Sequence, residues 1–230
     1  RFKSNKRWLQ SMHSFSFAEH SDPSWDNFGK ISVINQDIIS PDSGFCMHFH
    51  SNMEIITIVT KGAITHRDSL NNFVKIHKDE VQVMTAGTGI SHSEKNQENQ
   101  TCELFQIWIF PNKKNLKPEY KQISVKNKIG ENLIIDSLGR QINKLFINQD
   151  IFIWRCKYES TKDNKLPVGV EKFNWIQIID GNLSIRNKID NYEVNLLSGD
   201  GLGFEVYNYE DISIVSAEKV DFLLFSMPSL

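Results

Sequence analysis

The chain has 230 residues, which is enough for one large all-β domain or for two domains of about 115 residues each. Its 26 Lys and Arg residues nearly balance its 28 Asp and Glu residues, and the formal net charge of −2 argues against direct nucleic-acid binding or attraction to an anionic membrane. Three widely spaced cysteines without a Cys-x-x-Cys pair argue against a disulfide framework or a thiolate zinc site, and no apolar run reaches the roughly 18 residues of a membrane span. We therefore expect a soluble, cytoplasmic protein without a membrane segment.

Short strands separated by turns are predicted throughout the first half of the chain. Phe15 and Phe17 alternate with serines, as in a half-buried strand. Further β-branched or aromatic runs lie at residues 31–39, 44–60, 63–69, 74–76, 81–84 and 102–110. Strands at this spacing predict a sandwich or barrel and argue against βαβ units.

The second half repeats this pattern after a proline-bracketed, lysine-rich segment at residues 111–118, the best linker candidate. Its strand candidates lie at residues 133–137, 151–156, 173–179 and 220–225. Gly62 and Gly181 occupy similar β-runs at an offset of 119 residues, which predicts two copies of one β-fold, the second diverged. The predicted domains are residues 1–117 and 118–230. All seven histidines lie in the first 92 residues, so only the first copy can carry a histidine site.

Two short segments of the first half carry a candidate metal site. Side chains two residues apart in a strand point to the same face, so His48 and His50 share one face, and His92 and Glu94 share another. Two such strands side by side would bring three imidazoles and one carboxylate together, a donor set that suits a first-row transition metal. The alternative is a group of hydrogen-bonded polar residues within strands.

The remaining candidate residues have simpler interpretations. His66 shares strand parity with Asp68 and is expected to be structural. His13, His20 and His77 lie among polar residues and are expected to be solvated. Cys46 and Cys156 lie in apolar runs and are expected to behave as small hydrophobes, and Trp108 and Phe105 are expected in the core or in a pocket wall.

These segments resemble a known family. The run from His48 to Glu54, followed by a β-run to Gly62, resembles the first cupin motif, and Gly89-x-x-His92-x-x-x-Asn96 resembles the second. Residues 11–17, 62–69, 84–94, 106–111 and 200–202 are similar to pirins, in particular to bacterial pirin-like proteins with quercetin 2,3-dioxygenase activity. The resemblance implies an all-β bicupin of two face-to-face jelly-roll-like β-barrels, with a metal in the first barrel only.

The resemblance also implies a ligand set and a reaction. The implied ligands are His48, His50, His92 and Glu94, and the implied metal is one divalent ion, Fe(II) first, with Ni, Zn, Mn or Cu as alternatives. The implied reaction is cleavage of a flavonol such as quercetin by O2. Glu54 is the candidate catalytic base that removes the phenolic proton, and its alternative role is to orient a histidine ligand. Phe49 stands where the family commonly has Pro or Gly and is expected to reshape the mouth of the site.

Two other functions remain open on the sequence. One is a non-enzymatic, redox-sensitive iron protein that acts through a protein partner, and the other is a metal-free cupin scaffold. For the enzyme we expect a small aromatic substrate and O2 as partners, with no nucleic acid, no membrane and a monomeric chain.

Overall fold

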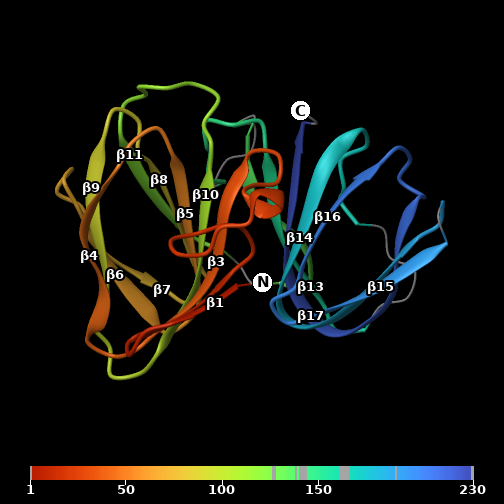
Figure 1. The fold of residues 1–230 in the computed structure, drawn as a ribbon, viewed down its shortest axis with the longest axis horizontal. Coiled ribbons are helices and arrows are strands. Elements are labelled where there is room, and N and C mark those ends of the chain that lie inside the picture. Colours follow the sequence, from red (N-terminus) through yellow and green to blue (C-terminus); the bar gives the residue numbers. More distant parts are fainter. Residues whose placement is uncertain are drawn as a thin grey trace. The chain divides into compact units, whose positions relative to one another are not determined.

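The computed structural model describes residues 2–125, 128–137, 139, 144–160, 166–189 and 191–228, without the side chains of residues 216–218. Strands dominate the described residues, as Figure 1 shows, and the regular helical element among them is one 3-10 turn, η1 (Pro23–Trp25), so the predicted all-β fold class is confirmed. None of the described residues forms a helix with the length and hydropathy needed to cross a bilayer.

The chain divides into two compact units. Unit 1 comprises Arg1–Val125 and Leu145–Gln149, and unit 2 comprises Lys126–Lys144 and Asp150–Leu230. The strands of unit 1 are β1 (Phe2–Asn5), β2 (Leu9–His13), β3 (Ile31–Ile39), β4 (Ser43–His50), β5 (Glu54–Lys61), β6 (Ala63–Asp68), β7 (Phe73–His77), β8 (Glu80–Thr85), β9 (Ile90–Asn96), β10 (Cys102–Ile109) and β11 (Glu119–Ser124). The strands of unit 2 are β12 (Gly130–Asp136), β13 (Phe152–Tyr158), β14 (Lys172–Asn187), β15 (Tyr192–Leu197), β16 (Gly201–Val206) and β17 (Ile212–Pro228).

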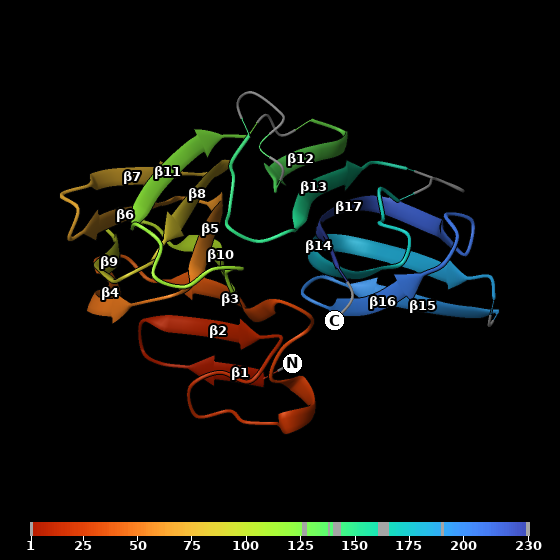
Figure 2. The ribbon, with the colours of Figure 1, turned by 90° about the horizontal axis from the view of Figure 1, so that it is seen from above.

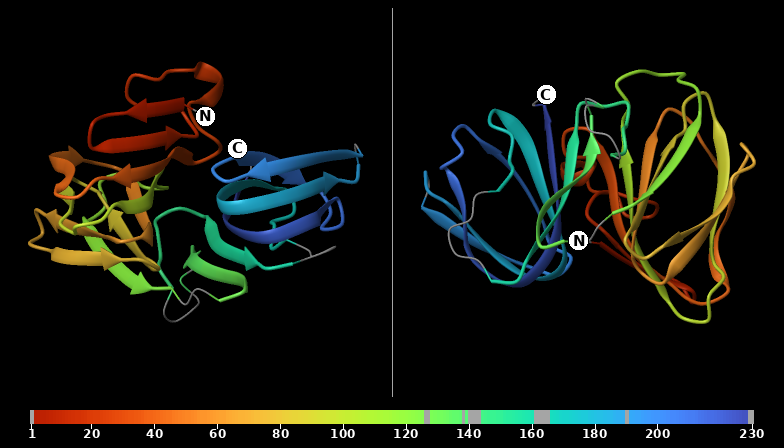
Figure 3. Two further views of the ribbon diagram at one scale, coloured as in Figure 1. Left: turned by 90° about the horizontal axis from the view of Figure 1, so that it is seen from below. Right: turned by 180° about the vertical axis from the view of Figure 1, so that it is seen from behind.

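Unit 1 consists of two sheets with an apolar and polar interior between them. The large sheet has the strand order β1-β2-β3-β10-β5-β8-β11, and the small sheet has the order β4-β9-β6-β7. Figure 3 shows these strands in colours from red to green. One core cluster joins them, because Val59 and Leu104 of the large sheet pack with Ile64 and Ile76 of the small sheet. Along β9 the burial alternates with a period of two, so that Ile90, His92, Glu94 and Asn96 are buried and the residues between them are not.

Unit 2 repeats the strand pairing of unit 1. The first half of β14 pairs with β16 and the second half with β15, just as β5 pairs with β8 and β6 with β7. The long strand β17 pairs along both halves of β14, as β10 pairs with β5 and β9 with β6 (Figure 2). Strands β12 and β13 continue this sheet beyond β17, as β2 and β3 continue the large sheet beyond β10. The internal repeat read from the glycines is therefore present in the pairing order.

Two glycines make the corresponding bends. Gly62 separates β5 from β6 with φ +73°, and Gly181 bends the continuous β14 with φ +86°. A Cβ at either position would lie within 3 Å of a backbone carbonyl oxygen, that of Thr101 or Lys219. Only glycine satisfies both the positive φ and the close approach without strain.

Candidate metal centre

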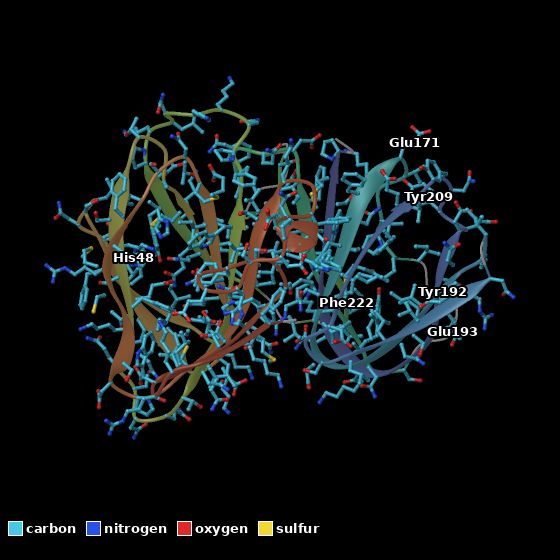
Figure 4. The ribbon with its side chains drawn as sticks, in the orientation of Figure 1. His48, Glu171, Tyr192, Glu193, Tyr209 and Phe222 are labelled. Carbon is cyan, nitrogen blue, oxygen red and sulfur yellow. The ribbon has the colours of Figure 1, made fainter. Side chains whose placement is uncertain are left out.

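Strands β4 and β9 bring three histidines together. The two strands are antiparallel, with His48 directly opposite His92 and His50 opposite Ile90, after a register shift between Phe45 and His48. The ligand atoms of His48, His50 and His92 all lie within 4.8 Å of one another, and we call these residues the outer triad. Figure 4 labels His48 on the small-sheet side of unit 1, and its Nδ1 lies 2.8 Å from the backbone oxygen of Cys46.

Gly44 permits the close approach of these two strands. A Cβ at this position would lie 2.1 Å from the backbone oxygen of Glu94, and the residue has φ +155°. A larger residue at this position would clash with the backbone of β9 unless the two strands moved apart locally.

A second group lies deeper in the same interior. Strand β6 pairs with β9 so that His66 lies opposite Glu94 and Asp68 opposite His92. The ligand atoms of His66, His92 and Glu94 lie within 4.8 Å of one another, and we call these residues the inner triad. All three are buried, so His92 is shared between a partly exposed group and a fully enclosed one.

Two imidazoles of the outer triad, those of His50 and His92, are neutral near pH 7. Burial, followed by the charge of His48, lowers the pKa of His50 to about 4, and burial followed by the charges of the neighbouring histidines lowers the pKa of His92 to about 2. Neutral imidazole is the form that binds metals. The Nε2 of His50 and both ring nitrogens of His92 are buried without a hydrogen-bond partner among the described residues. Buried polar atoms are rarely left unpaired, so this donor set fits a bound metal ion.

Glu94 is held by donors from the large sheet. The Thr57 hydroxyl donates to its Oε1 at 3.1 Å, and the Gln106 amide donates to its Oε2. Gln82 donates in turn to the Thr57 hydroxyl at 2.7 Å, which orients that hydroxyl toward Glu94. Burial, with a smaller contribution from the charge of Asp37, raises the pKa of Glu94 to about 7 against the lowering effect of the hydrogen bonds from Thr57 and Gln106. A cation beside this carboxylate would offset the cost of burying its charge.

The structure does not bring Glu54 to the histidines. Strand β4 ends at His50, and a turn with Asn52 at φ +50° precedes β5, so strand parity does not carry over from His50 to Glu54. The Glu54 carboxylate accepts hydrogen bonds from Thr85 at 2.8 Å and from Asn148 at 3.1 Å. Glu54 and Thr57 are three positions apart on β5 and therefore face opposite sides of the large sheet. Because Thr57 faces Glu94, Glu54 faces away from both triads.

Some of the remaining candidate residues lie as expected and others do not. His13, expected to be solvated, is buried with its Nδ1 2.7 Å from Oδ1 of Asn35, whereas His77 is exposed. Cys46 is exposed despite its apolar neighbours, and Cys156 is buried as expected. Trp108 packs edge-on against the His50 ring, with centroids 4.9 Å apart, and forms part of the site wall.

Phe49 does not narrow the site in this structure. Its side chain alternates with His48 and His50, points to the other face of β4 and is 63% exposed. Its ring lies against Gly89, where a Cβ would approach a ring atom to 2.6 Å. Gly89 therefore provides the space that Phe49 occupies on the outer surface.

Strand parity predicted the candidate pairs His48/His50 and His92/Glu94 but did not identify His66 as part of the cluster. Parity alone leaves open whether a strand residue faces the interior or the surface, and this choice depends on the pairing of β6 with β9. The sequence offered one signal for His66, its spacing of two residues from Asp68. In the structure the two side chains form a hydrogen bond of 2.9 Å between Nε2 of His66 and Oδ2 of Asp68.

The two units share one pairing order, and one of them contains a cluster of histidines and a carboxylate. These features define a two-domain cupin protein. A family model described as Pirin matches residues 1–109, and one described as the quercetinase C-terminal cupin domain matches residues 134–227. The chain belongs to the pirin family.

Named relatives extend over nearly the whole chain. The chain is 34% identical to quercetin 2,3-dioxygenase of Escherichia coli K12 over 225 residues, 97% of this chain and 94% of that protein. It is similar, with a TM-score of 0.90 and 33% identity, to the crystal structure of the E. coli bacterial pirin YhhW in complex with nickel(II), covering 100% of this chain and 96% of that one. It is also 52% identical to a pirin-like protein of Caulobacter vibrioides over 104 residues, 45% of each chain.

Proposed function

We propose that this protein is a metal-dependent dioxygenase that cleaves a flavonol-like aromatic substrate with O2. The observation that carries the proposal is the outer triad, in which three imidazoles lie together at the partly exposed end of the interior and those of His50 and His92 have unpartnered nitrogens among the described residues. The name of the E. coli relative supports the flavonol substrate, and the nickel complex of bacterial pirin YhhW supports metal binding in this fold.

The residues that would hold the metal are His48, His50 and His92, with Glu94 as the carboxylate ligand. A bound first-row metal supplies Lewis-acid and redox chemistry toward an aromatic hydroxyl and O2. Imidazole donors suit Fe(II), the expected native ion, and also Ni(II). Thr57 and Gln106 fix the Glu94 carboxylate, so that one more ligand is oriented before substrate arrives.

The other residues of the site would contact the substrate and exclude water. Trp108 presents an aromatic ring beside His50, which suits stacking or edge contact with a planar substrate. The apolar cluster of Ile55, Met84, Ala86 and Ile90 packs against Trp108 and keeps water from that wall. Glu54 lies on the opposite face of β5, and in this structure its carboxylate secures Thr85 and Asn148 rather than a substrate proton.

The test is flavonol turnover by metal-loaded protein. Metal-free protein is loaded anaerobically with Fe(II) or Ni(II), mixed with quercetin and exposed to O2. We expect loss of the flavonol absorbance together with O2 uptake. His92→Ala removes the histidine shared by both triads and should reduce turnover to background, whereas His77→Ala, at an exposed position of β7, should leave it unchanged.

Two results would contradict the proposal. One is a folded His92→Ala variant that turns over quercetin at the wild-type rate. The other is wild-type protein that holds a stoichiometric metal ion and leaves the flavonol intact, which would favour the regulatory, partner-binding alternative. The monomeric state also stays a prediction, to be checked by light scattering.

A further inference from the structure

The His66 side chain is held in one orientation by a carboxylate. Its Nε2 donates to Oδ2 of Asp68 at 2.9 Å, and both side chains are fully buried. The Asp68 carboxylate also accepts hydrogen bonds from the backbone nitrogens of Leu70 and Asn72 and from the Asn72 amide, at 2.8 to 3.1 Å. Asp68 therefore cannot turn away without losing several bonds, and it fixes both the ring orientation and the tautomer of His66.

This tautomer leaves the other ring nitrogen with a free lone pair. When Nε2 carries the proton, Nδ1 of His66 can only accept, and it is buried without a hydrogen-bond partner among the described residues. It lies within 4.8 Å of the ligand atoms of His92 and Glu94. No described lysine or arginine forms an ion pair with Glu94, so two acceptors and one carboxylate face one enclosed point.

We propose that the inner triad of His66, His92 and Glu94 is a metal position in its own right, for a first-row divalent transition metal. A carboxylate that accepts from the far nitrogen of a histidine is the usual arrangement behind a metal-bound imidazole, and Asp68 stands in this relation to His66. The inference is linked to the proposed function only through the shared residues His92 and Glu94, and it makes no use of a flavonol.

An aromatic ring encloses the inner triad on the side of His66. The Tyr120 ring packs on His66 with centroids 4.7 Å apart, and its hydroxyl donates to Gln122 at 2.8 Å. Tyr120 and Asn72 also line a pocket of about 380 Å³. The ring that covers His66 therefore also borders this pocket.

The test removes the outer triad and asks whether metal binding survives. The variant H48A/H50A keeps only the ligands of the inner triad. Metal-free protein is titrated with Ni(II) by calorimetry, and bound metal is counted after desalting. We expect H48A/H50A to retain one equivalent of Ni(II). Adding His66→Ala should weaken binding by at least tenfold, and adding Asp68→Asn should weaken it by about 10- to 100-fold.

A matched control and a spectroscopic readout separate ligation from a packing role. H48A/H50A/H77A removes a third histidine from an exposed position and should bind Ni(II) as H48A/H50A does. With Cu(II), the paramagnetic resonance spectrum of H48A/H50A should show coupling to two nitrogens, and that of H48A/H50A/H66A to one. Circular dichroism establishes that each variant is folded.

The proposal is overturned if folded H48A/H50A binds no more Ni(II) than H48A/H50A/H66A. It is also overturned if the nitrogen coupling is the same with and without His66. Neither result bears on flavonol turnover by the wild type, so failure of the inner position and failure of the dioxygenase proposal are distinguishable.

Discussion

The buried carboxylate of Asp37 should make the metal-free protein less stable as the pH rises. Asp37 lies on β3, is 2% exposed, and accepts a hydrogen bond from the Ser11 hydroxyl. Burial raises its pKa from 3.8 to about 7, although the Ser11 hydroxyl lowers it. Asp37→Asn keeps the shape and the acceptor for Ser11 but cannot ionise, so it isolates the effect of the charge.

The direction and size of the change in unfolding free energy follow from the pKa values of Asp37 in the folded and unfolded states. A carboxyl whose pKa is raised in the folded state binds more protons there than in the unfolded chain, so stability is fully present below about pH 4 and is lost as the pH rises through about 7. Each pKa unit corresponds to about 1.4 kcal/mol, which gives roughly 4 kcal/mol for complete ionisation of Asp37. Between pH 5 and pH 8 the wild type should lose about 3 kcal/mol through this group.

Chemical denaturation of metal-free protein from pH 5 to pH 8 measures the effect. Asp37→Asn should become more stable than the wild type as the pH rises, and the difference should grow by about 3 kcal/mol over this range. The substitution also removes one cause of the raised pKa of Glu94, which flattens the pH profile further. Asp42→Asn, at an exposed turn position, should follow the wild type. If Asp37→Asn keeps the wild-type slope of unfolding free energy against pH, the reasoning from burial is refuted.

Two substitutions in unit 2 test its packing by chemical denaturation. Gly181→Ala places a Cβ 1.9 Å from the backbone oxygen of Lys219 at φ +86°, and should cost at least about 2 kcal/mol; a neutral result would mean that β14 relaxes there. Asp221→Asn removes the carboxylate that binds both the Nε and an Nη of buried Arg155, at 3.0 and 2.8 Å, and should cost about 3 kcal/mol. Glu193→Gln breaks an exposed ion pair and should cost less than about 1 kcal/mol, so equal losses at Asp221 and Glu193 would contradict the role of burial.

Strand parity placed His48 with His50 on one face and His92 with Glu94 on another because a strand has a fixed period of two. The histidines at positions 48 and 50 needed only to lie in one strand, and the structure places them in β4 beside His92 of β9. The same rule did not extend to Glu54, because the turn at Asn52 interrupts the alternation of side-chain faces between β4 and β5. Periodicity holds within a strand and does not cross a turn whose length and conformation are unknown.

The fold was predictable at the level of class and repeat for a similar reason. Alternating apolar residues and turn glycines are local features, and they predicted an all-β chain with two related halves. Which strands pair is a nonlocal property, and it decides that β6 lies beside β9 and that His66 enters the interior. The burial of His13 and the exposure of Cys46 depend in the same way on contacts that sequence neighbours do not reveal.

The interior of unit 1 has polar residues at positions where unit 2 has an apolar contact. The offset that aligns Gly62 with Gly181 places His66 at the position of Ile185. His66 lies opposite Glu94 across β6 and β9, and Ile185 lies opposite Ile214 across β14 and β17, where both isoleucines are buried. A buried isoleucine contributes about 1.5–3 kcal/mol, whereas a buried carboxylate beside an imidazole whose Nδ1 lacks a hydrogen-bond partner among the described residues is costly. The same pairing order therefore supports an apolar pair in unit 2 and a polar pair in unit 1. A buried polar pair in place of apolar core packing is expected where a ligand stabilises the polar groups.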